Sequence, residues 1–409
     1  DTANPFEAVM VDTCITSAVK NKPAAENLVR FMDGRKSLLQ PERLTVAQSV
    51  YLNTQNSVIF KPSELNMRIY ELYGEKVKAL YDKWWDKIKT SREIEKNKRE
   101  LEEYRASLKP GDVALLGCLT EGGQGLATAN NGKYIAVRST TKWAENIRVS
   151  RPKKPADFLA RTPKAITAEM RRYPSYVAFL QSLSEAEIAE LFDSLKEQYG
   201  RDIFGQGYLY KIVDDCEIAD VDSLTNDEKE NGIETTKPYY VPYDKGDKDG
   251  NRWYLETPFA IAWSKENVRF LKTNSGKKGE GMPVVRNPQF YFREGFCWID
   301  VNSTYLKARI KANGVFDVLS MSLFTMTPPL PAWYFLALIY SQLLCLYLDN
   351  FINNTSHFQI NDARQLPIII PQKETFESLQ KLAADCISLK KVATTDDFLM
   401  GEKQYELNR

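Results

Sequence analysis

The side chains best placed for chemistry lie on a glycine-rich loop between two apolar segments. Residues 122–137 read GGQGLATANNGKYIAV. Three glycines within four residues, followed by paired asparagines, allow backbone conformations that most side chains forbid. Polar side chains on such a loop can reach base edges while cations near it contact phosphates. The candidates for base contacts are Gln124, Thr128, Asn130, Asn131 and Lys133, with Arg252 and Arg293 as weaker candidates.

The composition of this loop has two other interpretations. A tight turn that binds nothing has similar composition, and this interpretation stays open. A nucleotide-phosphate loop needs G-x-G-x-x-G or G-x-x-x-x-G-K-(S/T) spacing. In this chain Thr128 stands where the third glycine of the first pattern belongs, so phosphate cradling is not expected.

The charge of the chain is nearly balanced in total but unevenly distributed. The formal net charge is +1, yet residues 133–172 hold 11 Lys/Arg against 3 Asp/Glu. Residues 264–293 hold 7 against 2, and residues 214–230 hold 8 acids and one lysine. Basic patches of this kind are typical of DNA-binding surfaces, although solvated surfaces on separate elements remain an alternative. The phosphate candidates are Arg148, Arg151, Lys153, Lys154, Arg161 and Lys164 in the first patch and Lys272, Lys277, Lys278 and Arg286 in the second.

Residues for metal or nucleophilic chemistry are sparse. The six cysteines form no C-x-x-C pair and His357 is the single histidine, which argues against zinc sites and catalytic triads. The acids Asp214 and Asp215, and Asp244, Asp247 and Asp249, lack the spacing of a metal nuclease. Unpaired cysteines fit a reducing cytoplasm, where we expect the protein to be located. Because the chain begins with aspartate, we expect it to be part of a longer protein.

Hydrophobic periodicity predicts an α+β fold around these residues. Strands are expected over residues 7–19, 27–32, 58–61, 112–119, 134–138, 208–213, 261–263 and 289–293. Helices are expected from Ser63 as N-cap, over 75–108 with a break near 90, and over 184–199, 330–348 and 373–390. Residues 222–251 are expected to form an exposed loop. The apolar segment 330–348 contains Ser341 and Gln342, so a buried core helix is expected rather than a membrane span.

Several motifs occur in an order that points to one family. Gly125, Leu126, Thr128, Asn131 and Tyr134 follow a G-(L/I)-x-T-x-x-N-x-x-(F/Y) pattern, with Ala129 in place of a usual glycine. Later segments are YDKGDKDGNRWYLETPFAIAW, RNPQFYFREGFCWIDVNSTYLKAR, and LALIYSQLLCLYLDNF followed by FQINDARQLPIIIP. Together they resemble the target-recognition region of gamma-class adenine-N6 DNA methyltransferases. That family includes type IIG restriction–modification enzymes and BREX-type phage-defence methyltransferases.

The resemblance implies a division of the chain and a function. Residues 1–75 would be the trailing part of the catalytic domain, with a strand remnant of the methyltransferase sheet, and 76–110 a helical connector. Residues 111–330 would be a mixed α/β target-recognition domain, and 331–409 its C-terminal helices. The N-P-P-(Y/F) motif and the glycine-rich cofactor motif of the family are missing here.

The chain would therefore choose a DNA sequence without transferring a methyl group, with no catalytic residue, metal or cofactor of its own. The resemblance implies S-adenosylmethionine for the parent enzyme. It implies as partners duplex DNA, the catalytic domain of the same parent and other restriction or phage-defence subunits, and no membrane. The alternative is a protein-interaction module of a larger assembly with no direct DNA contact.

Overall fold

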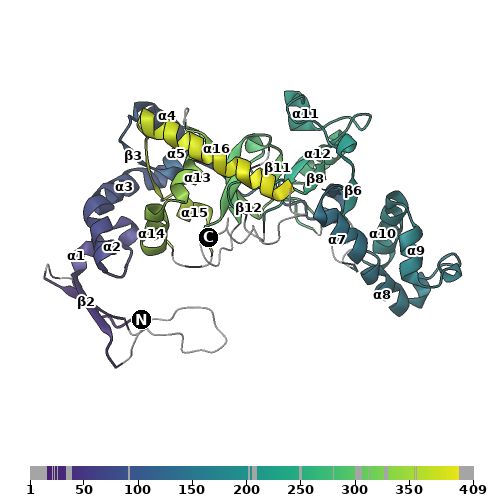
Figure 1. Cartoon of the computed structure of the whole chain (residues 1–409), viewed down its shortest axis with the longest axis horizontal. Helices are drawn as coiled ribbons and strands as arrows, with labels where there is room; N and C mark the ends of the chain where they lie inside the picture. Colours follow the sequence, from purple (N-terminus) through teal and green to yellow (C-terminus); the bar gives the residue numbers. More distant parts are fainter. Residues whose placement is uncertain are drawn as a thin grey trace. The chain divides into compact units, whose positions relative to one another are not determined.

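The computed structural model describes residues 16–20, 22, 24, 26–33, 39–90, 93–200, 203–204, 210–247, 251–279, 281–299, 306–311, 313–326, 330–353, 355 and 357–395. These residues form a mixed α+β structure in two compact units (Figure 1). Unit 1 comprises the described residues within 1–121, 301–306 and 325–381. Unit 2 comprises those within 122–300, 307–324 and 382–409.

Unit 1 begins with a two-stranded antiparallel sheet. β1 (Leu28–Asp33) pairs with β2 (Glu42–Ala47), and Lys61 binds the carboxylates of Asp33 and Glu42 that close its end. The short helices α1 (Gln48–Leu52) and η1 (Gln55–Ser57) follow. The predicted strand at 27–32 is confirmed, whereas residues 58–61 form no strand. Most of the predicted strand at 7–19 lies outside the described residues, and residues 16–19 form none.

A helical hairpin comes next in unit 1. The hydroxyl of Ser63 accepts from the backbone N–H of Asn66 and starts α2 (Glu64–Ile69), as predicted. The π-helical turn η2 (Tyr70–Gly74), α3 (Glu75–Thr90) and α4 (Glu95–Ser107) continue the chain, so the predicted break near residue 90 is confirmed. Trp84 is buried and stacks on Tyr104 with ring centroids 4.4 Å apart, which makes it a packing residue.

The remainder of unit 1 joins distant parts of the sequence. β3 (Val113–Leu115) pairs antiparallel with β13 (Pro367–Ile369), and α5 (Leu116–Leu119) follows β3. The strand expected over 112–119 is therefore a short strand followed by a helical turn. The last described helices are α13 (Ala332–Ile339), α14 (Gln342–Phe351), α15 (Ile360–Ala363) and α16 (Lys373–Thr395).

The expected single helix at 330–348 is two helices, because the hydroxyl of Ser341 caps α14 at the N–H of Leu344. α13 and α14 are bent by 71° at this break, and each has a buried apolar side. Among the residues that the structure describes, no single helix has the length and apolar character to cross a membrane. The bent pair passes that test only when its two helices are taken together.

Unit 2 contains two larger sheets, whose strands hold many of its buried residues. The five-stranded sheet has the order β11 (Val315–Phe316), β7 (Tyr240–Asp244), β8 (Phe259–Ala262), β5 (Ile135–Arg138) and β6 (Lys211–Val213). The four-stranded sheet has the order β10 (Ala308–Lys311), β9 (Gly295–Ile299), β12 (Ser320–Thr325) and β4 (Thr120–Gly123).

Two expectations for unit 2 are wrong. Residues 222–251 are not one exposed loop, since they include α11 (Asn226–Asn231) and the mostly buried β7. Pro242, which disfavours a strand assignment, sits within β7 next to the two residues that β11 pairs with, Tyr243 and Asp244. Residues 289–293 are not a strand either, because their first two residues belong to a 3-10 turn, η7 (Pro288–Phe290), and the next three form no strand.

A helical insertion lies between β5 and β6, which run parallel and so need a long crossover. It contains α7 (Lys142–Ser150), α8 (Lys153–Arg161), α9 (Tyr176–Ser182) and α10 (Glu185–Tyr199). The predicted capping box of Ser184 and Glu187 begins α10, and Gly200 ends it. The insertion has its own hydrophobic core, which includes Leu159, Phe179, Phe192, Leu195 and Phe204.

Candidate nucleic-acid interface

The first half of the glycine-rich loop is buried, which corrects the expectation that the whole loop faces a ligand. Gly125 and Leu126 are buried, and their N–H groups donate to the carbonyls of Asp317 and Phe316 at 3.2 and 2.7 Å. A Cβ at Gly125 would lie 1.9 Å from the Phe316 carbonyl oxygen, and one at Gly122 would lie 2.2 Å from that of Ser322. These two glycines therefore permit close backbone packing, and the packing alone explains them.

The second half of the loop reaches the surface. Thr128 is 2% exposed, so its predicted role in base contact is wrong in this conformation; its hydroxyl lies 2.5 Å from Oδ1 of Asn131. Oδ1 of Asn130 caps α6 (Asn131–Tyr134) by accepting from the N–H of Lys133. Asn130 and Asn131 are half-buried and keep their amide NH2 groups as donors, and Lys133 is exposed. Such donors suit the acceptors N7 and O6 at purine edges.

Ala129 adopts a conformation that glycine prefers. Its φ is +55°, at the position where the resembled family has glycine. A left-handed conformation costs a non-glycine residue about 1–2 kcal/mol, and glycine avoids this cost. Glycine also raises the conformational entropy of the unfolded chain, which offsets part of the gain in stability. We expect Ala129→Gly to raise the free energy of unfolding by about 0.5–1 kcal/mol in urea titrations. Ala127→Gly, in the same loop but at a negative φ, should lower it by a similar amount; stabilisation by both would contradict the explanation.

The structure places the loop beside the second basic segment. Ala127 forms a bridge with Val284, and Nδ2 of Asn287 donates to the carbonyl of Gln124 at 2.7 Å. Lys133 Nζ lies 5.3 Å from the ring centre of Phe270 on α12 (Lys265–Thr273). The surface end of the loop and the segment 265–293 therefore share one side of unit 2. We name this the loop–α12 surface, formed by Asn130, Asn131, Lys133, Lys272, Lys277 and Lys278.

The cations near this surface differ in availability. Lys277 and Lys278 are exposed, and Lys272 is exposed with Glu230 4.0 Å away. Arg286 is half-buried, and its buried Nη1 has no hydrogen-bond partner among the described residues. Arg293 is exposed beside the ring of Phe290, Gln124 is half-buried, and Arg252 is half-buried.

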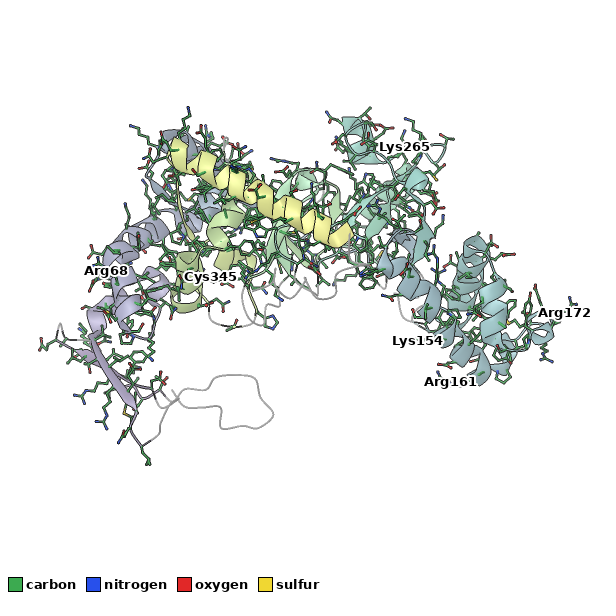
Figure 2. All side chains as sticks on the ribbon, in the orientation of Figure 1. Arg68, Lys154, Arg161, Arg172, Lys265 and Cys345 are labelled. Atoms are coloured by element: carbon green, nitrogen blue, oxygen red, sulfur yellow. The ribbon has the colours of Figure 1, made fainter. Side chains whose placement is uncertain are left out.

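The first basic patch lies on the helical insertion. Arg148, Lys153, Lys154, Arg161 and Lys164 are exposed there. Lys154 and Arg161 line one hollow of about 540 Å³ on α8 and its neighbours, and both are seen on the same helix in Figure 2. The prediction for Arg151 is wrong: it is 3% exposed and its Nη2 donates to the carbonyl of Tyr210 at 2.7 Å. Exposed Arg171 and Arg172 extend the patch, although they were not among the predicted contacts.

Acidic side chains neutralise some cations of unit 2 and leave others. Arg138 binds Asp215 and Glu256, Lys211 binds Glu217, and Lys265 binds Glu234. Most of these acids belong to the segment between β6 and β7. The sequence identifies this segment as acidic but does not show which basic residues it pairs with. Among the described residues no carboxylate pairs with the exposed side chains of Arg148, Lys153, Arg161, Lys164, Lys277 or Lys278. The positive charge that remains for a ligand lies on these two patches.

A buried charged cluster joins the two sheets of unit 2. Nη2 of Arg309 donates to Oδ1 of Asp244 at 2.7 Å, and both side chains are under 5% exposed. Burial raises the pKa of Asp244, but the charges of Arg309 and Lys311 outweigh it and hold that pKa below its usual value. Burial lowers the pKa of Lys311 to about 8 and raises that of the Cys297 thiol to about 12. This cluster organises the core and was not predicted.

The carboxylates weighed for nuclease chemistry serve other contacts. Asp244 pairs with Arg309, Asp215 with Arg138, and Oδ2 of Asp247 accepts from the Nδ2 of Asn251 at 3.0 Å. Asp249 lies outside the described residues. Within the part of the chain that is described, no group of three or more histidine, cysteine or acidic side chains could hold a metal ion.

Unit 2 is thus an α+β unit with a glycine-rich loop and two basic patches, each of which includes exposed cations without a carboxylate partner among the described residues. No protein-family model matches the chain, and a search of curated proteins finds no significant match.

Proposed function

We propose that unit 2 binds duplex DNA and that this chain is the target-recognition region of an adenine-N6 DNA methyltransferase of restriction or phage-defence type. The observation that carries the proposal is the loop–α12 surface. Its amide donors, Asn130 and Asn131, come two to three residues before Lys133, which packs against α12. The exposed Lys277 and Lys278 follow α12 and have no carboxylate partner among the described residues. Sequence recognition needs cations for phosphates and a few hydrogen-bonding side chains for base edges.

The two basic patches have different roles in this proposal. Lys277 and Lys278 lie in a turn with Gly276 and Gly279 at positive φ, so both lysines project from an exposed turn. They neutralise phosphates next to the bases that Asn130 and Asn131 contact. The cations of α7 and α8 contact the backbone further along the duplex.

Reversing the charge of the exposed turn should weaken DNA binding. We expect Lys277→Glu with Lys278→Glu to reduce affinity for a 20-base-pair duplex by about tenfold at 0.1 M salt and to lower the salt slope by about 2. Fluorescence anisotropy of labelled duplex across a salt series measures both. The matched control is Lys98→Glu with Arg99→Glu, two exposed cations in sequence on α4 that also have no acidic partner within the described part of the chain.

The outcomes separate the competing interpretations. Wild-type protein that binds no duplex even at low salt, or binds without a salt slope, contradicts DNA recognition. Equal losses in both double variants would show a general effect of charge with no role for the loop–α12 surface. Capture of a protein partner together with absent DNA binding would favour the alternative, a protein-interaction module.

We propose the catalytic domain of the same parent enzyme as the partner of unit 1. Four large apolar side chains between residues 52 and 72 are half or more exposed: Leu52, Ile59, Leu65 and Leu72. Exposed apolar side chains so close together in the sequence are the reason to propose a protein contact here. The catalytic domain would hold S-adenosylmethionine and transfer the methyl group, while this chain selects the site. The family resemblance is the reason to propose further restriction or phage-defence subunits as partners. We expect the protein to be located in the cytoplasm.

A further inference from the structure

A cavity of about 380 Å³ lies beside the loop–α12 surface in unit 2. Leu126 from the glycine-rich loop and Val268 and Leu271 from α12 form aliphatic walls. Trp263, Tyr291 and Phe292 form an aromatic wall, with the rings of Tyr291 and Phe292 6.0 and 5.8 Å from that of Trp263. This volume lies in the range of small-ligand sites, about 300–1,000 Å³, and such sites combine an apolar lining with a few polar groups.

The polar groups of the cavity lie on residues at the protein surface. Lys272 and Glu230, both exposed, approach within 4.0 Å of each other, and the exposed amide side chains of Asn226 and Gln289 also line the cavity. The indole N–H of Trp263 already donates to the carbonyl of Lys229 at 3.1 Å. The aromatic wall therefore offers ring surfaces to a ligand, while the hydrogen-bonding and cationic groups lie where a ligand would enter.

The backbone is strained at Phe292 of the aromatic wall and at Asn287, which lies next to the cavity-lining Pro288 in the sequence. Asn287 and Phe292 have φ of +53° and +58°, which is uncommon for residues other than glycine. Asn287 is tied to the loop through the carbonyl of Gln124, and the N–H of Phe292 donates to the carbonyl of Gly314 at 2.9 Å. Strained residues that their surroundings hold in place are concentrated at ligand-binding sites.

From this arrangement we infer that the cavity binds one nucleotide whose base lies outside a stack. An aromatic wall suits the flat face of any base, since base–aromatic contact is tolerant of sequence. Lys272 suits the attached phosphate, and the amides of Asn226 and Gln289 suit the edge of the base. Leu126 joins the cavity to the loop that reaches the DNA surface, so the inference rests on the proposed function and names a subsite within it. The source of the nucleotide is an unpaired base in a duplex.

The test compares two labelled duplexes that differ by one unpaired adenine. We expect the full chain to bind the duplex with the unpaired base about tenfold more tightly by anisotropy. Val285→Trp, which fills the cavity from its half-buried wall, should abolish that preference and leave affinity for the paired duplex unchanged. Val177→Trp on α9 is the matched control, and thermal unfolding verifies that each variant folds. If the tryptophan variant does not fold, Gln289→Ala at an exposed position replaces it in the test. This variant should reduce the preference for the unpaired base several-fold.

Each outcome bears on one proposal. Equal affinity of the wild type for both duplexes, or a preference that Val285→Trp retains, overturns the subsite while DNA binding stands. If neither duplex binds, the proposed function fails, and calorimetric titration with adenosine monophosphate then tests the cavity alone. Adenosine monophosphate binding that Val285→Trp abolishes would support a site for a free nucleotide, and no binding would overturn the inference.

Discussion

Replacing Arg309 with methionine should lower the free energy of unfolding by about 3–5 kcal/mol, the largest effect that we expect for one substitution. Arg309 is buried and its Nη2 lies 2.7 Å from Oδ1 of Asp244. The substitution would leave the Asp244 carboxylate in the core without its closest charge partner. Lys311 and the thiol of Cys297, 3.3 Å from Oδ2, remain near but do not replace a guanidinium.

The measurement is urea unfolding followed by circular dichroism. The control is the double variant Asp244→Asn with Arg309→Met, which removes both charges of the pair. It should be more stable than Arg309→Met alone, because a neutral amide costs less to bury than an unpaired carboxylate. A double variant whose loss equals the sum of the two single losses would show that the pair is not coupled.

Replacing Lys311 with methionine should change how stability depends on pH. The side chain of Lys311 is 1% exposed, and burial lowers its pKa from 10.5 to about 8. Between pH 8 and about 10.5 the unfolded chain therefore binds more protons at this residue than the folded chain. By linkage, this lysine makes the folded protein more stable as the pH rises through that window. The gain amounts to about 3 kcal/mol.

We expect the stability of Lys311→Met relative to the wild type to be greatest below pH 8 and to fall by about 3 kcal/mol by pH 10.5. Burial raises the pKa of Tyr51 and Tyr134 to about 12 in both proteins. The contribution of these tyrosines to the pH dependence of stability therefore cancels when the two proteins are compared. Urea unfolding at a series of pH values measures it. Lys278→Met, at an exposed site, should show no such trend, and a flat difference for Lys311→Met would refute the buried charge.

Local patterns in the sequence predicted some of the helices but missed α7, α8, α9, α11 and α12. The spacing of apolar residues predicted α3, α4, α10 and α16, and Ser63 and Ser184 were correctly identified as caps. These features depend on residues three or four positions apart, whose contacts form within one helix. The break between α13 and α14 was missed, although its cause, the hydroxyl of Ser341, is also local.

The candidate site could be predicted only in part. Composition identified the basic patches, and the structure leaves exposed most of the lysines and arginines proposed for them. Composition could not show that Arg151 binds the carbonyl of Tyr210, 59 residues away. It also could not show that Glu230 approaches Lys272 or that Glu234 binds Lys265. A charge is available to a ligand only if no distant residue neutralises it, and sequence spacing does not report such pairs.

The sequence by itself determined the α+β class, several amphipathic helices and the regions of positive charge, because these depend on the composition and spacing of neighbouring residues. The tertiary structure alone decided that Gly122 and Gly125 pack against the carbonyls of Ser322 and Phe316 and that Thr128 is buried. It also decided the pairing of Asp244 with Arg309 and the cavity beside Leu126. These features arise where segments far apart in the chain meet, and each depends on the packing of the whole unit.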